Sequence, residues 1–399
     1  MIRIFRIVGI AAIAGALLLN TRASGVSGGY VETDLVVNQE VGNVPTLTDK
    51  NGIVHVAKFF DPNLVNPWGV SEGPQSPFWV SDNGNGTASL YNTAGQPQTL
   101  VVAIPTPPDP QGASGTPTGQ AFNAAFLQGM FPVKGVNGGG SATTAGAIFL
   151  FATEDGTIAG WNPGVNPAGF NPLTVGKHAI IVVDNSASPD ACHGAVYKGL
   201  AIATGANGTF LYVTNFRAGK VEVYDTAFKP VNLPSGAFTD PHLPSRYAPF
   251  NIVAVNVNNT TELFVTYAVQ NKAKHDDAAG QGKGIVDVYD LNGNLLMRFA
   301  SHKELNSPWG VALAPAGFGQ FGGELLIGNF GDGGINAFDP SNGNSLGPVR
   351  DAQGRPIVID GLWALQFGNG FNGGDKGTLY FTAGPNDESD GLFGSLAPQ

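Results

Sequence analysis

The stretch FFDPNLVNPWGV, residues 59–70, contains the pattern that decides the fold. Its last part returns as YAPFNIV at 247–253 and as SPWGVAL at 307–313. Each copy has a polar loop, a proline, an aromatic residue, a small residue and a run of β-branched or apolar residues. A segment that restarts in the same way along the chain indicates an internal repeat, and such a repeat determines the architecture.

Each copy also continues in the same manner. NPWGV leads to PFWVSDNGNG, a second strand that ends in a polar cluster, and then through a tight turn to TASLYNTAGQ. Six copies can be aligned, with anchors at Trp68, Phe122, Gly199, Phe250, Trp309 and Trp363. Repeats of roughly 40–50 residues that each give four short strands are typical of propeller blades. The sequence therefore predicts an all-β fold, a six-bladed β-propeller with four-stranded blades.

The aromatic anchors predict the centre of this propeller. We expect Trp68, Trp309 and Trp363 to occupy equivalent positions on the innermost strands and to be buried between blades. The glycine that follows an anchor, Gly69 or Gly310, would allow neighbouring strands to approach closely near the axis.

The repeats fill one domain, which we expect to span residues 24–399. The blades lie near 59–104, 116–184, 195–233, 247–301, 306–351 and 360–396. The last copy lacks a fourth strand, and the segment YVETDLVVNQ at 30–39 belongs to no repeat. We therefore expect residues 30–39 to complete the last blade and close the ring, which would remove exposed sheet edges.

The first 23 residues predict export. MIRIFR is basic, and the apolar segment at 7–19 is typical of a signal peptide and short for a membrane span. An uncleaved anchor helix is the alternative. We expect a secreted or periplasmic monomer with no membrane span after cleavage.

Charge and cysteine content restrict the partners and cofactors. Removing residues 1–23 would take away three arginines and no acid, so the formal charge would change from −10 to −13. Such an acidic chain disfavours nucleic acid and anionic membranes as partners. Cys192 is the single cysteine, so no internal disulfide can form. The Cys192–His193 pair lacks the further ligands of a zinc site.

The repeats resemble those of a known class of propellers. PWGV followed by FWVSDNGNG is similar to NHL-type repeats, in which a P-x-G-[IV] strand leads to an [LF]-[YW]-V-[AS]-[DN] strand. With GAVYKGLAIA, LYVTNFRAGKVEVYD and GTLYFTAGPNDESDGLFG, the chain resembles more closely an uncharacterised family of exported bacterial six-bladed propellers. The resemblance covers most of the chain. It implies the fold and implies no activity.

The topology of a four-stranded meander locates a candidate site. It places the start of the first strand and the end of the second strand at one face, near the axis. The polar residues expected at this ligand-binding mouth are Asn66, Asp82, Asn83, Glu154, Asp155, Asn215, Arg217, Asn251, Asn306, Asn329 and Asp360. Asp82, Glu154, Asp155 and Asp360 are candidate ligands for calcium, which takes roughly six to eight oxygens. Turn formation is the alternative role for these residues, because Asn and Asp are common in tight turns.

Catalytic motifs do not fit their required contexts. GVSGG at 25–29 matches G-x-S-x-G without the strand–turn–helix that this motif needs. The charged loop at 270–284 contains His275, Asp276 and Asp277, which could contact a metal ion, but we expect a solvated loop tip.

Two classes of function remain. The first is an exported propeller that binds a protein, peptide or glycan at one mouth of the channel, with no catalysis. The second is a calcium-dependent hydrolase or lactonase-like enzyme that uses the acidic residues of the same mouth. We favour the first, because the chain offers many acceptor oxygens and no nucleophile with a recognisable base.

Overall fold

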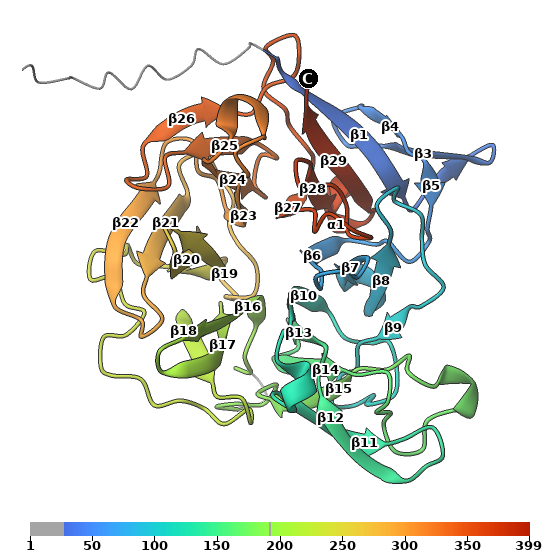
Figure 1. The fold of residues 1–399 in the computed structure, drawn as a ribbon. Coiled ribbons are helices and arrows are strands. Elements are labelled where there is room, and N and C mark those ends of the chain that lie inside the picture. Colours follow the sequence, from blue (N-terminus) through green and yellow to red (C-terminus); the bar gives the residue numbers. More distant parts are fainter. Residues whose placement is uncertain (1–27, 191–192) are drawn as a thin grey trace, which may run out of the picture.

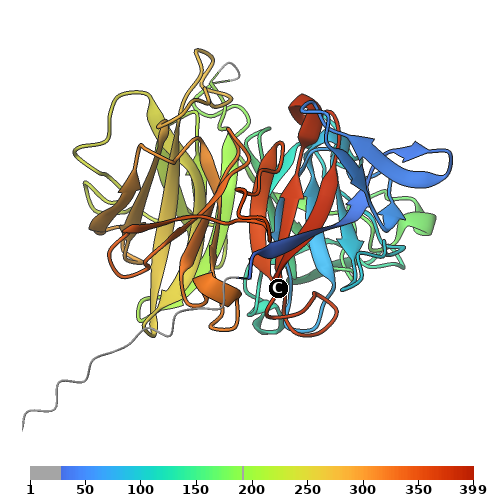
Figure 2. The same ribbon diagram turned by 90° about the horizontal axis from the view of Figure 1, so that it is seen from above.

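The structure is a computed structural model that describes residues 28–190 and 193–399. The predicted signal peptide and Cys192 lie outside these residues. Figure 1 shows antiparallel sheets arranged around a central region in the manner of a propeller, and Figure 2 shows them turned by 90°. No helix of the described part is long and apolar enough to cross a membrane. The fold is therefore all-β and propeller-like, as the repeats predict.

Four of the eight sheets in the described residues are four-stranded meanders that follow the order of the sequence repeats. The first contains β6 (Pro67–Ser71), β7 (Phe78–Asp82), β8 (Thr87–Tyr91) and β9 (Val102–Ala103), and the second contains β10 (Pro117–Phe122), β13 (Phe149–Thr153), β14 (Thr157–Trp161) and β15 (Ile180–Asp184). The third contains β19 (Tyr247–Val257), β20 (Thr260–Val269), β21 (Gly284–Tyr289) and β22 (Leu295–Ser301). The fourth contains β23 (Pro308–Leu313), β24 (Leu325–Asn329), β25 (Ile335–Phe338) and β26 (Ser345–Pro348). The first strand of each sheet lies innermost in Figure 1.

Two sheets depart from the expected four strands. One has three strands, β16 (Tyr197–Gly205), β17 (Gly208–Asn215) and β18 (Lys220–Tyr224), and the other has five, in the order β27 (Leu362–Phe367), β28 (Leu379–Ala383), β29 (Leu392–Pro398), β1 (Tyr30–Val37) and β5 (Phe59–Phe60). The prediction of four strands is therefore wrong for the first, whereas the second has β1 as its fourth strand and the two-residue β5 in addition. In the first, the segment after Tyr224 makes one isolated bridge, to Pro230, instead of a fourth strand.

The structure also contains smaller sheets and short helical segments outside these larger sheets. A three-stranded sheet contains β2 (Glu40–Val41), β3 (Val44–Thr48) and β4 (Val54–Val56), and a hairpin contains β11 (Pro132–Val136) and β12 (Ala142–Gly146). The helical segments are α1 (Pro385–Glu388) and the 3-10 turns η1 (Asn83–Asn85), η2 (Phe126–Gln128), η3 (Pro172–Thr174) and η4 (Gly319–Phe321).

Burial on both faces explains why the middle strands read as continuous apolar runs. Every residue of β7, β13, β24 and β28 is buried. Each sheet packs between two neighbours, so both faces of its middle strands are covered, and the apolar–polar alternation of a half-exposed strand is lost.

The three predicted tryptophans meet at the centre. Trp68, Trp309 and Trp363, which we call the tryptophan plug, are 2%, 4% and 1% exposed. The rings of Trp68 and Trp363 stack with centroids 3.5 Å apart, and Trp309 meets both edge-on at 6.1 and 5.9 Å. Trp68 on β6 also contacts Phe250 on β19, from the opposite side of the molecule in Figure 1. The prediction that these anchors are equivalent and buried is confirmed.

Close approach of the inner strands explains the glycine after each anchor. A Cβ atom on Gly69 would lie 2.5 Å from the carbonyl oxygen of Thr118, and one on Gly310 would lie 2.7 Å from that of Trp363. Both oxygens belong to the neighbouring inner strand. A larger residue at either position would separate the two strands.

Polar side chains tie neighbouring sheets together across these approaches. Each donates to a backbone carbonyl of the next sheet: Gln120 to Gly69, Thr118 to Tyr197, Thr214 to Phe250, Asn251 to Trp309 and Thr382 to Trp68. The last of these joins β28, near the end of the chain, to β6, near its beginning. The side chains thus satisfy carbonyl groups that would otherwise be buried without a donor.

The segment predicted to complete the last blade pairs with it. β1 runs antiparallel to β29, from Tyr30 opposite Pro398 to Val37 opposite Leu392. β1 ends at Val37, so the strand is shorter than the predicted 30–39, and Gln39 donates to Asp390 beyond it.

Candidate functional site

Strand register brings several polar loops to one end of the sheets. Pro67 of β6 lies opposite Asp82 of β7, and Pro308 of β23 lies opposite Asn329 of β24. The segments before the first strands and after the second strands therefore extend from the same end, close to the tryptophan plug. This is the mouth that the repeat topology predicts.

Five side chains at this mouth form a connected polar group, which we call the axial cluster. It consists of Asn66, Asn83, Glu154, Lys198 and Glu388. Asn66 and Asn83 flank β6 and β7 of one sheet, whereas Glu154 follows β13, Lys198 lies on β16 and Glu388 lies in α1, so the arrangement of the sheets assembles the group.

Lys198, on β16, is the cation of the axial cluster. Its side chain is 2% exposed and forms an ion pair with Glu154. Its Nζ atom lies 3.6 Å from a carboxylate oxygen of Asp276 and 4.8 Å from the centroid of the Trp68 ring. A buried ammonium group is costly unless it is paired. Here two carboxylates and a cation–π contact supply that compensation.

Two asparagines connect the ion pair to the tryptophan plug. The Nδ2 group of Asn83 donates to Glu154 at 2.9 Å. Asn66 donates to the side-chain oxygen of Asn83 at 3.3 Å and to Glu388 at 2.8 Å, and it accepts from the indole N–H of Trp363 at 3.1 Å. The network fixes the orientation of both amide groups.

Glu388 enters the cluster from a strained turn. Asn386, Asp387 and Glu388 have φ values of 59°, 54° and 68°, three consecutive left-handed residues without a glycine. Non-glycine residues adopt this conformation at a cost, and runs of them are found where a site requires a particular geometry. Burial, together with the nearby charges of Glu154 and Asp276, raises the pKa of Glu388 to about 7.

An open cleft of about 550 Å³ lies beside the axial cluster. We call it the carboxylate cleft; its lining includes Lys50, Phe330, Asp332, Asp360, Asp387 and Glu388. Lys50 bridges two of these carboxylates, at 3.1 Å from Asp360 and 2.8 Å from Asp387. The ring of Phe330 stacks on Trp363 with centroids 3.9 Å apart, so the aromatic floor of the cleft continues into the tryptophan plug.

Three of the predicted residues belong to the axial cluster, and one belongs to the cleft. Asn66, Asn83 and Glu154 come together as the topology predicts, and Asp360 lies in the carboxylate cleft. The prediction missed Glu388, Lys50 and Phe330. Glu388 directly follows Asn386 and Asp387, in the polar segment after the second strand β28, and a polar cluster at that place in the repeat is the signal that could have revealed it.

Asp82 and Asp155 take no part in the axial cluster. Asp82 is fully buried and accepts hydrogen bonds from the hydroxyls of Ser89 and Thr87, both at 3.1 Å, within its own sheet. Asp155 accepts from the backbone N–H and the hydroxyl of Thr116 at 2.8 and 2.9 Å. Both carboxylates are therefore occupied by hydrogen-bond donors close to them in the sequence.

The four proposed calcium ligands are not assembled into one site. Besides Asp82 and Asp155, which take no part in the axial cluster, Glu154 is paired with Lys198 and Asp360 with Lys50. In both places a lysine ammonium group already supplies the positive charge that a calcium ion would bring. The geometry therefore gives no common oxygen cage for calcium among these residues.

Three predicted asparagines act within the framework. Asn251 ties β19 to β23 through the carbonyl of Trp309. Asn306 and Asn329 both donate to the carboxylate of Asp332, at 3.3 and 3.1 Å. These side chains hold loops in place, which is the turn-forming role that the sequence left open.

Asn215 and Arg217 lie at a separate cavity. Asn215 donates to Glu222 at 2.9 Å, and Arg217 donates to the carbonyl of Gly194 at 2.9 Å. Both residues line a cavity of about 800 Å³ beside the three-stranded sheet. They take no part in the axial cluster.

The loop at 270–284 reaches the axial cluster. His275 lies 3.9 Å from Glu154 and 2.7 Å from Asp276, which itself lies near Lys198. The side chain of Asp276 is 58% exposed, so the loop tip is solvated as expected while it also contacts Lys198 of the axial cluster.

The raised pKa of Glu388 predicts a pH dependence of stability. A carboxyl whose pKa is near 7 in the folded state and about 4.5 when unfolded holds its proton more tightly in the fold. Its contribution to stability is therefore complete below pH 4.5 and is lost as the pH rises toward 7. We expect Glu388→Gln to flatten the fall in the free energy of unfolding between pH 5 and pH 7, as measured by urea denaturation. An unchanged slope in this variant would contradict the assignment.

Comparison with solved structures supports the fold. A structural genomics protein of unknown function from Bacteroides thetaiotaomicron aligns with a TM-score of 0.52 and 10% identity, over 93% of this chain and 76% of that one. Solved structures of lower similarity comprise enzymes and binding proteins alike. No protein-family model matches the chain.

Comparison with curated sequences identifies relatives in a virus. Uncharacterized protein R648 of Acanthamoeba polyphaga mimivirus is 33% identical over 341 residues, covering 84% of this chain and 76% of R648. Uncharacterized protein L690 of the same virus is 32% identical over 348 residues, covering 86% and 82%. These relatives give no support for the bacterial origin that the resemblance implied. The chain belongs to the family of propeller-like proteins that includes R648 and L690.

Proposed function

We propose that the protein binds a short glycan in the carboxylate cleft. The observation that carries the proposal is the chemistry that faces this one space of about 550 Å³: several carboxylates, the ammonium group of Lys50 and the ring of Phe330. Sugar hydroxyls donate to carboxylates and accept from an ammonium group. The apolar face of a sugar ring can pack on an aromatic side chain.

The size of the cleft and its rigid surroundings support a small ligand. Its volume falls within the roughly 300–1,000 Å³ of small-molecule sites. The left-handed turn at 386–388 and the buried ion pair of Lys198 hold its walls in a defined position. Preorganised walls lower the entropic cost of binding.

Isothermal titration with cellotetraose, chitotetraose and the peptide tetralysine tests the proposal. We expect one of the oligosaccharides to bind and Phe330→Ala to weaken it about tenfold, because an aromatic contact contributes up to roughly 1.5 kcal/mol. Asp387→Asn, at an exposed position, should also weaken binding and keeps the test valid if Phe330→Ala fails to fold. Glu262→Gln, near the start of β20 at the other end of the sheets, is the matched control and should bind as the wild type does. Binding of tetralysine alone would contradict the glycan proposal in favour of a peptide ligand.

Hydrolysis of the same glycan is the second candidate function. The observation that favours it is the pKa of Glu388, near 7, which suits a general acid at neutral pH. The route differs from the calcium-dependent one considered from the sequence, because lysines occupy the cationic positions. Release of shorter sugars by the wild type and its absence in Glu388→Gln would support this function; binding without any product would exclude it for the sugars tested.

The arrangement of the sheets supports a finer description of the scaffold, which we also propose. The sheets that begin with β6, β10, β16, β19, β23 and β27 would be six blades, and β1 would close the ring as the fourth strand of the last. The pairing of β1 with β29 and the bond from Thr382 to Trp68 support closure between the first and last blades. Deleting β1 tests this description, and its expected result is given in the Discussion.

A further inference from the structure

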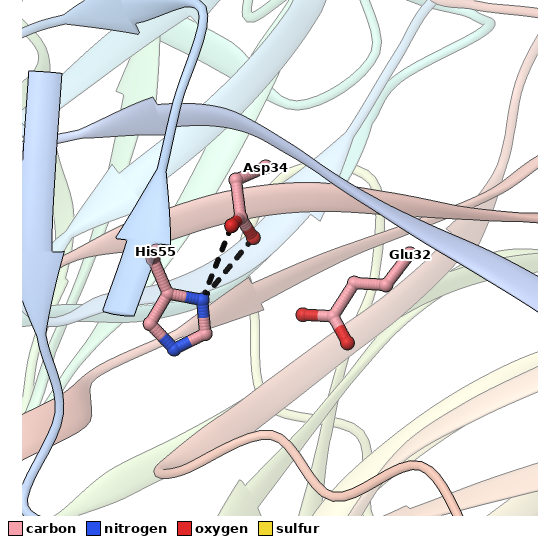
Figure 3. A group of neighbouring side chains, drawn as sticks. All are labelled: Glu32, Asp34 and His55. Carbon is pink, nitrogen blue, oxygen red and sulfur yellow. Dashed lines mark hydrogen bonds and ion pairs between the residues drawn. The ribbon is translucent and has the colours of Figure 1, made fainter. Parts of the chain in front are cut away.

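We propose that Glu32, Asp34 and His55 form a binding site for a divalent transition-metal ion, most suitably zinc, with Asp49 as an outer partner. The site lies outside the mouth, where the hairpin of β3 and β4 packs against β1. Figure 3 shows the carboxylates of Glu32 and Asp34 on the same side of the His55 imidazole, with Asp34 facing the Nδ1 atom of the ring. The proposal is independent of the glycan-binding function.

The ligand atoms come from separate segments and converge on one point. Glu32 and Asp34 lie two residues apart on β1, so their side chains share one face of the strand. His55 is the middle residue of β4 and is 5% exposed. One ligand atom from each of the three lies within 4.8 Å of the others. Imidazole nitrogen and carboxylate oxygen are both ligands that zinc accepts.

The spacing of Asp34 and His55 suits two ligands of one ion. The Nδ1 atom of His55 lies 3.2 and 3.3 Å from the two carboxylate oxygens of Asp34. Ligand atoms placed at about 2.0–2.1 Å from a tetrahedral ion are roughly 3.3 Å apart. Zinc could therefore replace the proton between these groups with little movement of either side chain.

Asp49 occupies the place of an outer partner. Its Oδ2 atom lies 3.9 Å from the Nε2 atom of His55, on the side of the ring away from Asp34. A histidine that binds a metal through one nitrogen commonly presents its other N–H to a carboxylate, which fixes the ring and raises its basicity. Asp49 is itself held by the backbone N–H groups of Asn51 and Ile53, at 2.9 and 2.8 Å.

The charge of the group calls for a cation. Three carboxylates surround one imidazole, so the net charge is negative even when His55 is protonated. Among residues 28–190 and 193–399, no lysine or arginine forms an ion pair with Glu32, Asp34 or Asp49, and no hydrogen bond reaches the carboxylate of Glu32. A bound cation would balance this negative charge.

A second group in the same molecule provides the contrast. Glu154, His275 and Asp276 also bring two carboxylates and an imidazole together. There, however, the Nζ atom of Lys198 contacts both carboxylates and supplies the positive charge. The group at β1 has similar ligands and lacks such a lysine, which is why we assign the metal to it alone.

A metal at this place would hold the hairpin to the framework. β1 belongs to the five-stranded sheet, whereas β3 and β4 belong to the small sheet beside it. An ion bound to Glu32, Asp34 and His55 would join the two sheets. Protons compete with the metal for the ligand atoms of Glu32, Asp34 and His55, and also bind to the outer carboxylate of Asp49, so metal affinity should fall at acidic pH.

Titration of the chelator-treated full chain with zinc chloride at pH 7.5 tests the proposal. We expect one zinc per chain and a rise in melting temperature. Since loss of an outer partner alone costs roughly 10–100-fold in metal affinity, the double variant Glu32→Gln with His55→Gln should lose at least as much. His275→Gln, which removes the imidazole of the contrasting group, should bind zinc as the wild type does. Substitution with cobalt should give the visible absorption of a four-coordinate site in the wild type and lose it in the double variant.

A second variant, Glu32→Gln alone, and a comparison of zinc with calcium ensure that the experiment can contradict the proposal. If His55→Gln disturbs folding, Glu32→Gln alone serves, because that carboxylate has no hydrogen bond in the described residues to lose. The proposal is overturned if the wild type binds no zinc, if Glu32→Gln binds it unchanged, or if calcium binds more tightly than zinc.

Discussion

A chain that begins at Asn38, and so lacks β1, should not show the cooperative unfolding of a chain that begins at Gly28. β1 contributes Leu35, Val36 and Val37 to the core, each at most 2% exposed, and its pairing covers the edge of β29. At about 1.5–3 kcal/mol for each buried aliphatic side chain, the loss is a large share of the roughly 5–15 kcal/mol by which a domain is stable. The uncovered edge of β29 would also promote aggregation.

Denaturant titration followed by circular dichroism measures this effect. Val31→Ser is the control, because Val31 lies on the same strand and is 41% exposed; it should change stability little. If the chain without β1 unfolds at the same denaturant concentration as its parent, the ring is not closed by this strand.

Lys198→Met should destabilise the fold by about 3–5 kcal/mol, the range for breaking a buried ion pair. The substitution leaves Glu154, whose side chain is 11% exposed, next to a buried apolar chain and without its cation. Adding Glu154→Gln removes the stranded charge and should restore much of the lost stability. A double-mutant cycle measured by urea denaturation gives the coupling between the two residues.

Lys220→Met is the matched control for this cycle. Lys220 pairs with Glu222 at 3.1 Å, but its side chain is 60% exposed. An exposed pair contributes at most about 1 kcal/mol, so this variant should be nearly as stable as the wild type. If Lys198→Met costs no more than Lys220→Met, the axial ion pair does not organise the mouth.

The arrangement of the sheets could be predicted because the same sequence pattern recurs at the start of each repeat. An aromatic residue after a proline, then a glycine and a β-branched run, identifies the inner strands, and Trp68, Trp309 and Trp363 occupy them as expected. The unmatched segment before the first repeat and the missing strand after the last likewise predict that β1 pairs with β29.

The location of the candidate site could be predicted from the sequence, but the contacts of its individual side chains could not. Asp82 and Asn83 are adjacent in the sequence, but Asp82 accepts a hydrogen bond from Ser89 of its own sheet, whereas Asn83 donates to Glu154 of the axial cluster. The sequence does not distinguish these two roles. Glu154 and Lys198 are 44 positions apart and meet only when their sheets become neighbours. The left-handed turn that places Glu388 in the axial cluster contains no glycine, so the sequence lacks the usual signal for this conformation.

The cluster at β1 was missed for a related reason. Glu32 and Asp34 read as the polar face of a strand, and His55 as one of six scattered histidines. Their meeting depends on the hairpin of β3 and β4 folding back on β1, a contact that no repeat pattern encodes.

The central claim is that the mouth beside the tryptophan plug is the binding face. The most direct test is hydrogen–deuterium exchange of the protein, measured with and without the tightest-binding oligosaccharide. The account predicts that backbone amides at 329–333 and 384–388, which border the carboxylate cleft, exchange more slowly in the presence of the sugar. Protection confined to the other end of the channel, around 366–374, or no protection at 384–388, would contradict it.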